Sequence, residues 1–332
     1  MSRDSEINVV VTGVGAIIGQ GIVRSLRTSG YPLRIIGVDK NERSPGSYMV
    51  DVFIRKPQVL EDSDEYMDFW VELIRENNIQ LVVPGLEVDM YFFHQHRDWA
   101  DSFEVVHVLN SASLIEITSD KWWFSERLKS FDYPVIPSVQ TDHWEEALYT
   151  LGTPPLLMKP LHGNGSRGIV RLENKADFEY WKKKANDTWM LQRIVGSDHE
   201  EYTVGVFGLG DGKFIGPIIF RRKLSSAGNT LEANVVASHY IIESATERLC
   251  KHFEPVGPTN LQFRIEDGTP YLLEINPRFS SSNSLRTAFG FNEAKMAIEF
   301  YLHKQTPEVP VIKLGTGWRY SEDYVIYASH SL

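Results

Sequence analysis

The spacing of apolar residues changes near residue 110, and this change restricts the folds that the chain can adopt. Up to that point, β-branched segments that predict strands alternate with segments of helical spacing: strands over 7–12, 33–39 and 81–84, and helices over 19–29 and 64–77. Such alternation is typical of a parallel sheet with helices on its faces. From residue 156 onward, short β-rich segments are separated by glycine-containing turns, which favours antiparallel hairpins. We therefore expect an α/β unit followed by an α+β region.

The composition of the chain excludes several classes of function. Its 332 residues allow two or three packed units. Lys and Arg number 34 against 44 Asp and Glu, and the net charge of −10 disfavours binding along a nucleic-acid backbone. No apolar stretch approaches the roughly 18 residues of a membrane-spanning helix. Cys250 is the only cysteine and the charged start lacks the apolar region of a signal peptide. We expect a cytoplasmic protein without nucleic-acid or membrane partners.

Gly13, Gly15 and Gly19 lie between the first predicted strand and the first predicted helix, and Asp39 ends the next strand. In a parallel sheet this layout can bind a dinucleotide, with the pyrophosphate at the helix start and a ribose at the carboxylate. However, the glycine spacing is one residue longer than in the dinucleotide motif, and a tight turn needs small residues in any case. An NAD(P)-dependent oxidoreductase therefore stays open as one alternative.

Lys159 stands at the end of an apolar strand, and a loop rich in glycine runs from Gly163 to Gly168 directly after it. Consecutive backbone N–H groups in such a loop can surround an anion, and the lysine adds a positive charge beside them. The pattern suits a polyphosphate. It also suits a plain hairpin turn with an exposed lysine.

Glu274, Asn276 and Arg278 follow one another at two-residue intervals near the end of a predicted strand. Alternate residues of a strand share a face, so the oxygens of Glu274 and Asn276 point to one side, as Mg²⁺ ligands would. The arginine just beyond suits the charge of a phosphoryl group in transfer. A turn over 266–270 would bring Gln262 of the preceding strand alongside. The alternative is that these residues form only the water-facing side of an antiparallel sheet.

In this order the segments resemble the ATP-grasp superfamily along nearly the whole chain. The resemblance rests on Asp120-Lys121 at a helix start, Lys159 with its loop, the run 191–196, the segment 201–204 and the string 274–278. With Gln262 and the Gly13–Gly19 turn, the chain is most similar to the ATP-grasp halves of the carbamoyl-phosphate synthase large subunit. The resemblance implies a Rossmann-like pre-ATP-grasp domain over 1–110, a small lobe with the Gly-rich loop over 111–195, and a C-terminal lobe with the metal site over 196–332.

The resemblance also implies roles for individual residues. The residues expected to bind ATP are Lys121, Lys159, Gly163, Asn164, Gly165, Ser166, Gly168, Gln192, Arg193, Ile194, Val195, Glu201 and Arg222. Glu200 is the alternative to Glu201 for binding the ribose. The expected ligands of Mg²⁺, or alternatively Mn²⁺, are Gln262, Glu274 and Asn276. At the acceptor substrate we expect Gly15, Glu87, Arg278, Ser280 and Ser281. Arg278 and Lys159 are expected to act on the phosphoryl group in transfer.

The expected activity is ATP-dependent ligation of a carboxylate to an amine through an acyl phosphate, with release of ADP and phosphate. Carbamoyl phosphate is not the expected product, because the chain has room for one ATP-grasp unit and carries Ser281 where the synthetase has a further arginine. A kinase that releases the phosphorylated product is the nearest alternative. The expected partners are a small carboxylate and a small amine, and a homodimer is left open.

Overall fold

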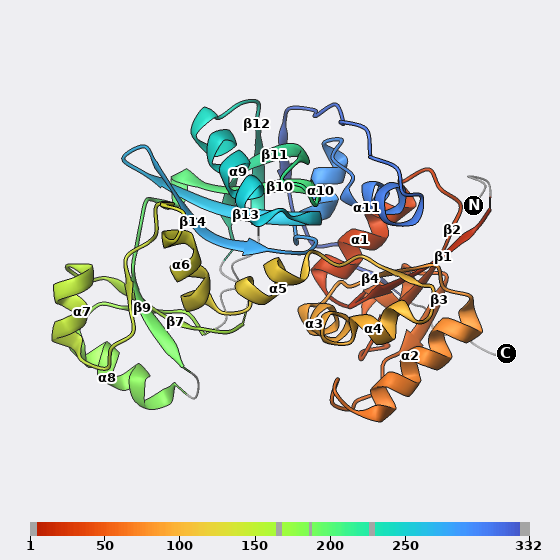
Figure 1. Cartoon of the computed structure of the whole chain (residues 1–332), viewed down its shortest axis with the longest axis horizontal. Coiled ribbons are helices and arrows are strands. Elements are labelled where there is room, and N and C mark those ends of the chain that lie inside the picture. Colours follow the sequence, from red (N-terminus) through yellow and green to blue (C-terminus); the bar gives the residue numbers. More distant parts are fainter. Residues whose placement is uncertain (1–4, 164–167, 186–187, 226–229, 326–332) are drawn as a thin grey trace.

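The computed structural model describes residues 5–163, 168–185, 188–225 and 230–325. Within these residues the chain is a mixed α/β protein built on three β-sheets, and the mixed α/β class expected from the sequence is confirmed. Figure 1 shows three neighbouring parts: the first sheet with its helices in red to orange, the six-stranded sheet in the middle, and the small sheet with α7 and α8 at the far end. No helix in the described part of the chain is long and apolar enough to cross a membrane.

The first sheet is parallel and has the strand order β3-β2-β1-β4-β5. Its elements are β1 (Ile7–Thr12), α1 (Ile17–Arg27), β2 (Leu33–Asp39), η1 (Pro45–Tyr48), β3 (Val52–Arg55), α2 (Asp64–Asn77), β4 (Leu81–Val83), α3 (Glu87–Gln95), α4 (Arg97–Asp101) and β5 (Val106–His107). Successive residues of β1 enter different cores: Val9 and Val11 pack with α1, whereas Val10 packs with α2 and α3. Helices therefore cover both faces of this sheet.

The small sheet is antiparallel, with the order β6-β9-β7-β8. Its elements are β6 (Ser138–Val139), α7 (Trp144–Leu151), β7 (Leu156–Pro160), β8 (Val170–Leu172), α8 (Lys175–Lys184) and β9 (Trp189–Arg193). Trp144 of α7 and Phe178 of α8 pack against Leu156 and Met158 on one face. Since strand residues alternate between faces, Lys159 lies on the face that turns away from these helices.

The six-stranded sheet is antiparallel, with the order β14-β13-β10-β11-β12-β15. Its strands are β10 (Glu201–Leu209), β11 (Phe214–Leu224), β12 (Thr230–Val236), β13 (Val256–Glu266), β14 (Thr269–Asn276) and β15 (Thr316–Trp318), and η2 (Asp198–Glu200) leads into it. One face packs against α5 (Ala112–Thr118), α6 (Lys121–Lys129) and α9 (Tyr240–Phe253). The other face packs against α10 (Asn283–Ala288), α11 (Glu293–Ala297) and η3 (Ile298–Leu302).

Helix α1 joins the first sheet to the six-stranded sheet. Ile22 and Leu26 of α1 share one core with Phe207 and Phe220 of the larger sheet and with Phe291 near α11. A side chain of α10 also binds the backbone of α1, since Nδ2 of Asn283 donates a hydrogen bond to the carbonyl oxygen of Ile18 over 3.2 Å. The carboxyl edge of the first sheet is thereby held beside the end of β14.

The segment after η3 returns to the first part of the chain. Its strand β15 pairs with β12, and Arg319 donates a hydrogen bond to the carbonyl oxygen of Ser281 over 2.5 Å. Further along, Tyr324 stacks on Tyr48 of η1, with ring centroids 5.0 Å apart. The segment 316–324 thus ties the edge of the six-stranded sheet to the first sheet.

Several elements differ from the sequence-based expectation. The helix expected over 19–29 occupies Ile17–Arg27, and β3 and α5 were not expected. In the aromatic run Trp122-Trp123-Phe124 of α6, Phe124 is buried, whereas Trp123 is 65% exposed. Consecutive residues of a helix point in different directions, so only part of such a run can face the core.

Candidate active site

Glu201 is held between two arginines on one face of the six-stranded sheet. Arg222 of β11 donates to its Oε1 from Nε over 3.0 Å, and Arg264 of β13 donates to its Oε2 from Nε over 2.9 Å. The carboxylate is buried, and both of its oxygens already accept charge-assisted bonds. Glu200 is directed elsewhere, since its Oε2 accepts from the Tyr202 hydroxyl over 2.7 Å.

A chain of polar side chains continues from Arg222 to the end of β14. Arg222 donates to Oε1 of Gln262, and Nε2 of Gln262 donates to Oε1 of Glu274. That oxygen also accepts from Nδ2 of Asn276 over 2.8 Å, and Oδ1 of Asn276 accepts from Arg278 over 2.8 Å. Gln262 and Glu274 lie opposite each other in the β13–β14 register, so the pairing expected from the intervening turn is confirmed.

The donor set at this end of the hairpin fits a magnesium ion. Glu274 offers one carboxylate, and Gln262 and Asn276 offer amide oxygens, which are the hard oxygen ligands that Mg²⁺ prefers alongside phosphate oxygens. Among the residues that the structure describes, no group of three or more His, Cys, Asp or Glu could hold a metal by itself. Oxygens from a bound substrate would therefore have to complete such a site.

Arg278 connects this chain to the first sheet. Its Nε donates to Oε1 of Glu87 over 2.8 Å, its Nη2 donates to the same carboxylate, and its Nη1 donates to the carbonyl oxygen of Phe279 over 2.9 Å. Arg278 and Glu87 are 12% and 16% exposed, so this ion pair is well shielded from water. Because Glu87 is the first residue of α3, the pair lies at the carboxyl edge of the parallel sheet.

Two lysines approach the site from the small sheet and from α6. Lys159 donates from Nζ to Oε1 of Gln192 over 2.5 Å, and Gln192 donates to Ser138 over 2.9 Å. Burial lowers the pKa of Lys159 to about 8. Lys121 donates to the carbonyl oxygen of Gly163 over 2.7 Å, and burial also lowers its pKa. Both ammonium groups thus donate to neutral oxygens, a backbone carbonyl for Lys121 and a side-chain amide for Lys159.

The Gly-rich loop joins β7 to β8, which pair as an antiparallel hairpin. Gly163 and Gly168 have φ values of +96° and +74°, a region that favours glycine. No atom of the described residues lies within 4 Å of a Cβ placed on Gly163, so space is open on that side. Asn164, Gly165 and Ser166 lie outside the described residues.

The side chain of Arg193 forms an ion pair with Glu266 over 2.7 Å. Val195 is buried and Ile194 is half-buried where the chain passes from the small sheet to the larger one. A ligand at this crossing would therefore meet Ile194 and the backbone more readily than the Arg193 guanidinium.

The glycine turn before α1 is already occupied by a side-chain carboxylate of the protein, that of Asp39. The N–H of Gly15 donates to Oδ2 of Asp39 over 2.8 Å. Gly46 of η1 lies against the turn, since a Cβ at Gly46 would come within 1.6 Å of the carbonyl oxygen of Val14. A dinucleotide would have to displace both Asp39 and η1, which disfavours the oxidoreductase alternative.

Ser280 and Ser281 follow Arg278 on the way to α10. Ser280 is buried and its Oγ accepts from the N–H of Ser282 over 3.1 Å. Ser281 is half-buried and its carbonyl oxygen is bound by Arg319. The structure thus places both serines close to Arg278 in the chain, with Ser280 turned inward.

The site has an excess of positive charge. Arg222 and Arg264 share Glu201, Arg264 also pairs with Asp198, and Arg278 pairs with Glu87. Lys121 and Lys159 instead donate to neutral oxygens, and two partly buried ammonium groups of this kind favour an anionic ligand.

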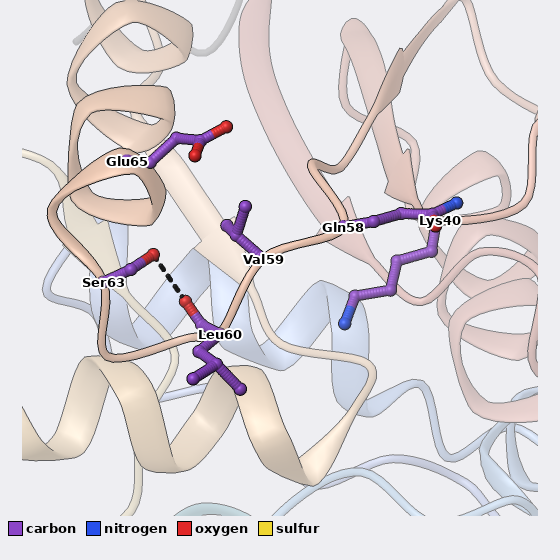
Figure 2. A pocket seen from close by; sticks show the side chains of 6 residues that line it. All are labelled: Lys40, Gln58, Val59, Leu60, Ser63 and Glu65. Atoms are coloured by element: carbon purple, nitrogen blue, oxygen red, sulfur yellow. Dashed lines mark hydrogen bonds between the residues drawn. The ribbon is translucent and has the colours of Figure 1, made fainter.

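A separate hollow lies at the start of α2, away from these residues. It is lined by Lys40, Gln58, Val59, Leu60, Ser63 and Glu65. Figure 2 shows the Ser63 hydroxyl directed at the carbonyl oxygen of Leu60, a hydrogen bond of 2.7 Å just before the helix. None of these six residues belongs to the candidate site, and Lys40 is paired with Glu61.

Comparison with known proteins supports an interpretation of this site. A family model described as "ATP-grasp in the biosynthetic pathway with Ter operon" matches residues 186–323. An ADP complex of N5-carboxyaminoimidazole synthetase from Staphylococcus aureus superposes with a TM-score of 0.72 and 16% identity, covering 94% of this chain and 81% of that one. Residues 186–323 are thus similar to an ATP-grasp domain, and the fold of nearly the whole chain is shared with this synthetase.

Other proteins similar to this chain extend the comparison. The carbamoyl phosphate synthase large chain of Methanoregula boonei is 25% identical over 340 residues, which cover 91% of this chain and 31% of the relative. The chain thus spans about a third of the length of that relative. Biotin carboxylase from Campylobacter jejuni gives a TM-score of 0.71 at 17% identity, covering 93% of this chain and 74% of that one.

Sequence analysis missed Arg264. Arg264 is bound to Glu201 and to Asp198, the latter over 2.6 Å. It stands two residues after Gln262, so the same alternation that placed Glu274 beside Asn276 could have placed it on the face of Gln262.

Proposed function

We propose that this protein is an ATP-dependent carboxylate–amine ligase that acts through an acyl phosphate and releases ADP and phosphate. The observation that carries the proposal is the connected set of Gln262, Glu274, Asn276 and Arg278 facing two lysines in one positively charged site. Relatives with comparable activities support it: an L-amino acid ligase from Bacillus licheniformis has a TM-score of 0.66, and a D-alanine–D-alanine ligase from Coprothermobacter proteolyticus is 27% identical over 163 residues.

The proposed organisation follows the three sheets. Residues 1–110 would form a Rossmann-like pre-ATP-grasp domain, residues 111–195 the small lobe, and residues 196–332 the C-terminal lobe. The strand order of each sheet is compatible with this division. Because α1 shares a core with the six-stranded sheet, residues 1–110 and 196–332 would move as one rigid body.

ATP would lie between the small sheet and the six-stranded sheet. Its phosphates would be bound by Lys121, Lys159 and the Gly163–Gly168 loop, because the two ammonium groups approach this space from different elements. Adenine would lie near Gln192 and Val195, and the ribose near Glu201. Since Arg222 and Arg264 already hold both oxygens of Glu201, ribose hydroxyls would have to share these bonds.

Mg²⁺ would be held by Glu274 and by the amide oxygens of Gln262 and Asn276, as their donor chemistry allows. The ion would supply neutralisation of the charge on the β- and γ-phosphates. Arg222 and Arg278 occupy the two amide oxygens in the structure, so these arginines would shift toward phosphate oxygens when the nucleotide binds.

The reaction requires positioning more than a protein nucleophile. A carboxylate oxygen of the substrate attacks the γ-phosphorus, a new O–P bond forms, and the bond to the β–γ bridging oxygen breaks with ADP as the leaving group. An amine then attacks the acyl carbon, phosphate leaves and the amine loses a proton. Arg278 would stabilise the phosphoryl group in the first step and Lys159 its charge on the ATP side.

The acceptor substrate would lie near Gly15, Glu87, Ser280 and Ser281, where the carboxyl edge of the first sheet meets the end of β14. Substrates in this position would be small molecules. The net charge of −10 gives no support for a nucleic-acid partner.

Trapping with hydroxylamine tests the proposed reaction. With a suitable acid, Mg·ATP and hydroxylamine but no amine, the enzyme should form the hydroxamate and ADP in equal amounts. Formation of AMP and pyrophosphate would contradict the acyl phosphate. ADP together with a stable phosphorylated product that hydroxylamine leaves intact would identify a kinase instead.

A further inference from the structure

We infer that Asp39 binds the amine substrate as an ammonium ion and accepts the proton that the amine has to lose before it attacks the acyl phosphate. The inference rests on the proposed function and adds a binding site for the second substrate of that reaction. Its basis is a carboxylate at the carboxyl edge of the first sheet that is contacted by neutral donors alone.

The contacts of Asp39 leave its negative charge unbalanced. Its Oδ2 accepts from the N–H of Gly15 over 2.8 Å, and its Oδ1 accepts from the N–H of Asn41 over 2.9 Å. Each oxygen thus keeps one lone pair for a further donor. The residue is half-buried, so a ligand can reach the carboxylate from one side. Within the described part of the chain Asp39 forms no ion pair.

The cations around Asp39 are engaged with other carboxylates. Arg55 is its register partner on β3, and Lys40 and Lys56 directly follow these two residues in the chain. Their ion pairs are Lys40 with Glu61 over 3.0 Å, Arg55 with Glu42 over 3.9 Å, and Lys56 with Asp89. Arg43 in the loop after β2 is exposed and is not paired with Asp39. A cation from outside the protein would therefore find the Asp39 charge uncompensated.

A second unused acceptor lies beside Asp39. Oγ of Ser44 is buried and has no hydrogen-bond partner among the residues that the structure describes. A Cβ placed on Gly15 would lie 2.9 Å from Oδ2 of Asp39 and 3.1 Å from this hydroxyl oxygen, so both oxygens face the same side of the turn. An ammonium group has three N–H donors and no acceptor, so it suits a carboxylate next to a hydroxyl.

The position of Asp39 also suits the second substrate. Ligands of parallel sheets bind outside the carboxyl ends of the strands. Asp39 ends β2, Glu87 begins α3 after β4, and β1 lies between these two strands. Since neighbouring strands are about 4.8 Å apart, the two positions are separated by about 10 Å. An ammonium nitrogen about 3 Å from Asp39 and an acyl carbon about 3 Å beyond it would fill most of the distance to Arg278.

The proton transfer follows from the chemistry of the amine. An ammonium ion has no lone pair, so one N–H bond has to break before attack, and its proton forms an O–H bond with Asp39. The freed electron pair of the nitrogen attacks the acyl carbon, and the C–O bond to the phosphate breaks. The second proton that the nitrogen loses leaves with the phosphate. Asp39 then returns its proton to water on its exposed side.

Competition between two nucleophiles tests the inference with the full chain, Mg·ATP and an acid that supports hydroxamate formation. Hydroxylamine is uncharged at neutral pH, whereas methylamine, ethanolamine and the amino groups of free amino acids are ammonium ions. Both nucleophiles consume the same acyl phosphate, so the ratio of amide to hydroxamate reports the capture of the amine alone. We expect at least one of these amines to form an amide in the presence of hydroxylamine.

Asp39→Asn should lower the ratio of amide to hydroxamate by at least about tenfold, because a neutral amide neither attracts an ammonium ion nor takes its proton. Ser44→Ala should lower the ratio less, since it removes a neutral acceptor. Asp51→Asn is the matched control: Asp51 also accepts a backbone N–H, that of Ile35 over 2.7 Å, but is paired with Arg27 over 2.8 Å. Its ratio should equal that of the parent, and the melting temperature of each variant reports the fold.

An unchanged ratio in folded Asp39→Asn, or an equal fall of amide and hydroxamate, would overturn the inference while leaving the ligase proposal in place. Hydroxamate without amide from any of these amines would also overturn the inference, whereas the acyl phosphate would stand. If no acid gave ADP and hydroxamate, the proposed function and the inference would fail together.

Discussion

Lys159 and Gln192 are diagonal neighbours across the β7–β9 pair, with the lysine nitrogen 2.5 Å from Oε1 of the glutamine. Because Gln192 uses its Nε2 on Ser138, its oxygen is the atom that faces the lysine. A neutral amide thus holds a partly desolvated ammonium group in place. The charge of Lys159 therefore remains available to a ligand.

The affinity for ATP should depend on pH through Lys159. The pKa of this lysine in the free protein is about 8, lowered from 10.5 mainly by burial. Below pH 8 the group is charged and binds phosphate fully; above pH 8 it must take up a proton on binding, so affinity falls by up to about tenfold per pH unit. Lys159→Arg, which stays charged, should flatten this fall in calorimetric titrations between pH 7 and about 9.5. Parallel curves for the two proteins would remove Lys159 from the phosphate site.

Glu274→Ala should abolish Mg²⁺-dependent turnover with little change in the fold. Glu274 is half-buried at the end of a hairpin, and its removal frees two amide N–H groups of polar side chains outside the apolar cores. We expect kcat to fall by at least about a hundredfold, as for loss of a group that neutralises charge in the transition state. ADP release measured across Mg²⁺ and Mn²⁺ titrations checks this, with the melting temperature as control. Normal ADP release from the folded variant would contradict the metal assignment.

Removal of the Asp120 cap should weaken both α6 and ATP binding. Asp120 accepts from the N–H groups of Trp122 and Trp123 over 2.7 and 2.9 Å, and Lys121 is the first residue of the helix that it caps. Asp120→Ala should cost about 1 kcal/mol of unfolding free energy in urea. It should also raise the Kd for ATP, because the position of Lys121 becomes less fixed.

Asn174 provides the matched control, since it caps α8 with similar geometry, accepting from Ala176 over 2.9 Å. Asn174→Ala should cause a comparable loss of stability without changing the Kd for ATP. Asp120→Asn, which keeps the cap and removes the charge, separates the two effects. If Asn174→Ala weakened the affinity for ATP as much as Asp120→Ala does, a general loss of stability, and not the displacement of Lys121, would explain the effect.

Breaking the buried pair between Arg286 and Glu293 should destabilise the protein severely. Both side chains are fully buried and 3.1 Å apart, and burial raises the pKa of Glu293 and lowers that of Arg286. Glu293→Gln leaves the arginine without a countercharge and should cost about 3–5 kcal/mol of unfolding free energy. The double variant Arg286→Met/Glu293→Leu should recover much of this loss in denaturant titrations. A single variant as stable as the parent would mean that the pair contributes no net stabilisation.

The parts of the site that sequence reasoning located depend on local rules. Alternation along one strand placed Glu274 beside Asn276, and the single turn between β13 and β14 brought Gln262 opposite Glu274. In the first sheet, the predicted helix over 64–77 agrees with α2, which is delimited by Ser63 as its cap and by Asn78 in the left-handed conformation.

The parts that were not predicted depend on contacts between distant segments. The clamp on Glu201 needs three strands in register, and the pair of Arg278 with Glu87 joins the segment after β14 to the first residue of α3. The turn at Gly15 is occupied by Asp39 and η1, and this depends on how these two segments fold back onto it. No local pattern carries this information, because it depends on how the sheets pack. The functional roles of these residues stay predictions.

The stacking of Tyr324 on Tyr48 also bears on the order in which the molecule is completed during synthesis. The first sheet leaves the ribosome early, but the ring that stacks on Tyr48 and the strand that pairs with the edge of β12 are synthesised only after the other strands of all three sheets. A nascent chain that stalls before residue 316 would therefore present an unpaired strand edge and an uncovered tyrosine. These are features by which chaperones and proteases recognise unfinished proteins, so incomplete chains of this protein should be cleared before they bind nucleotide.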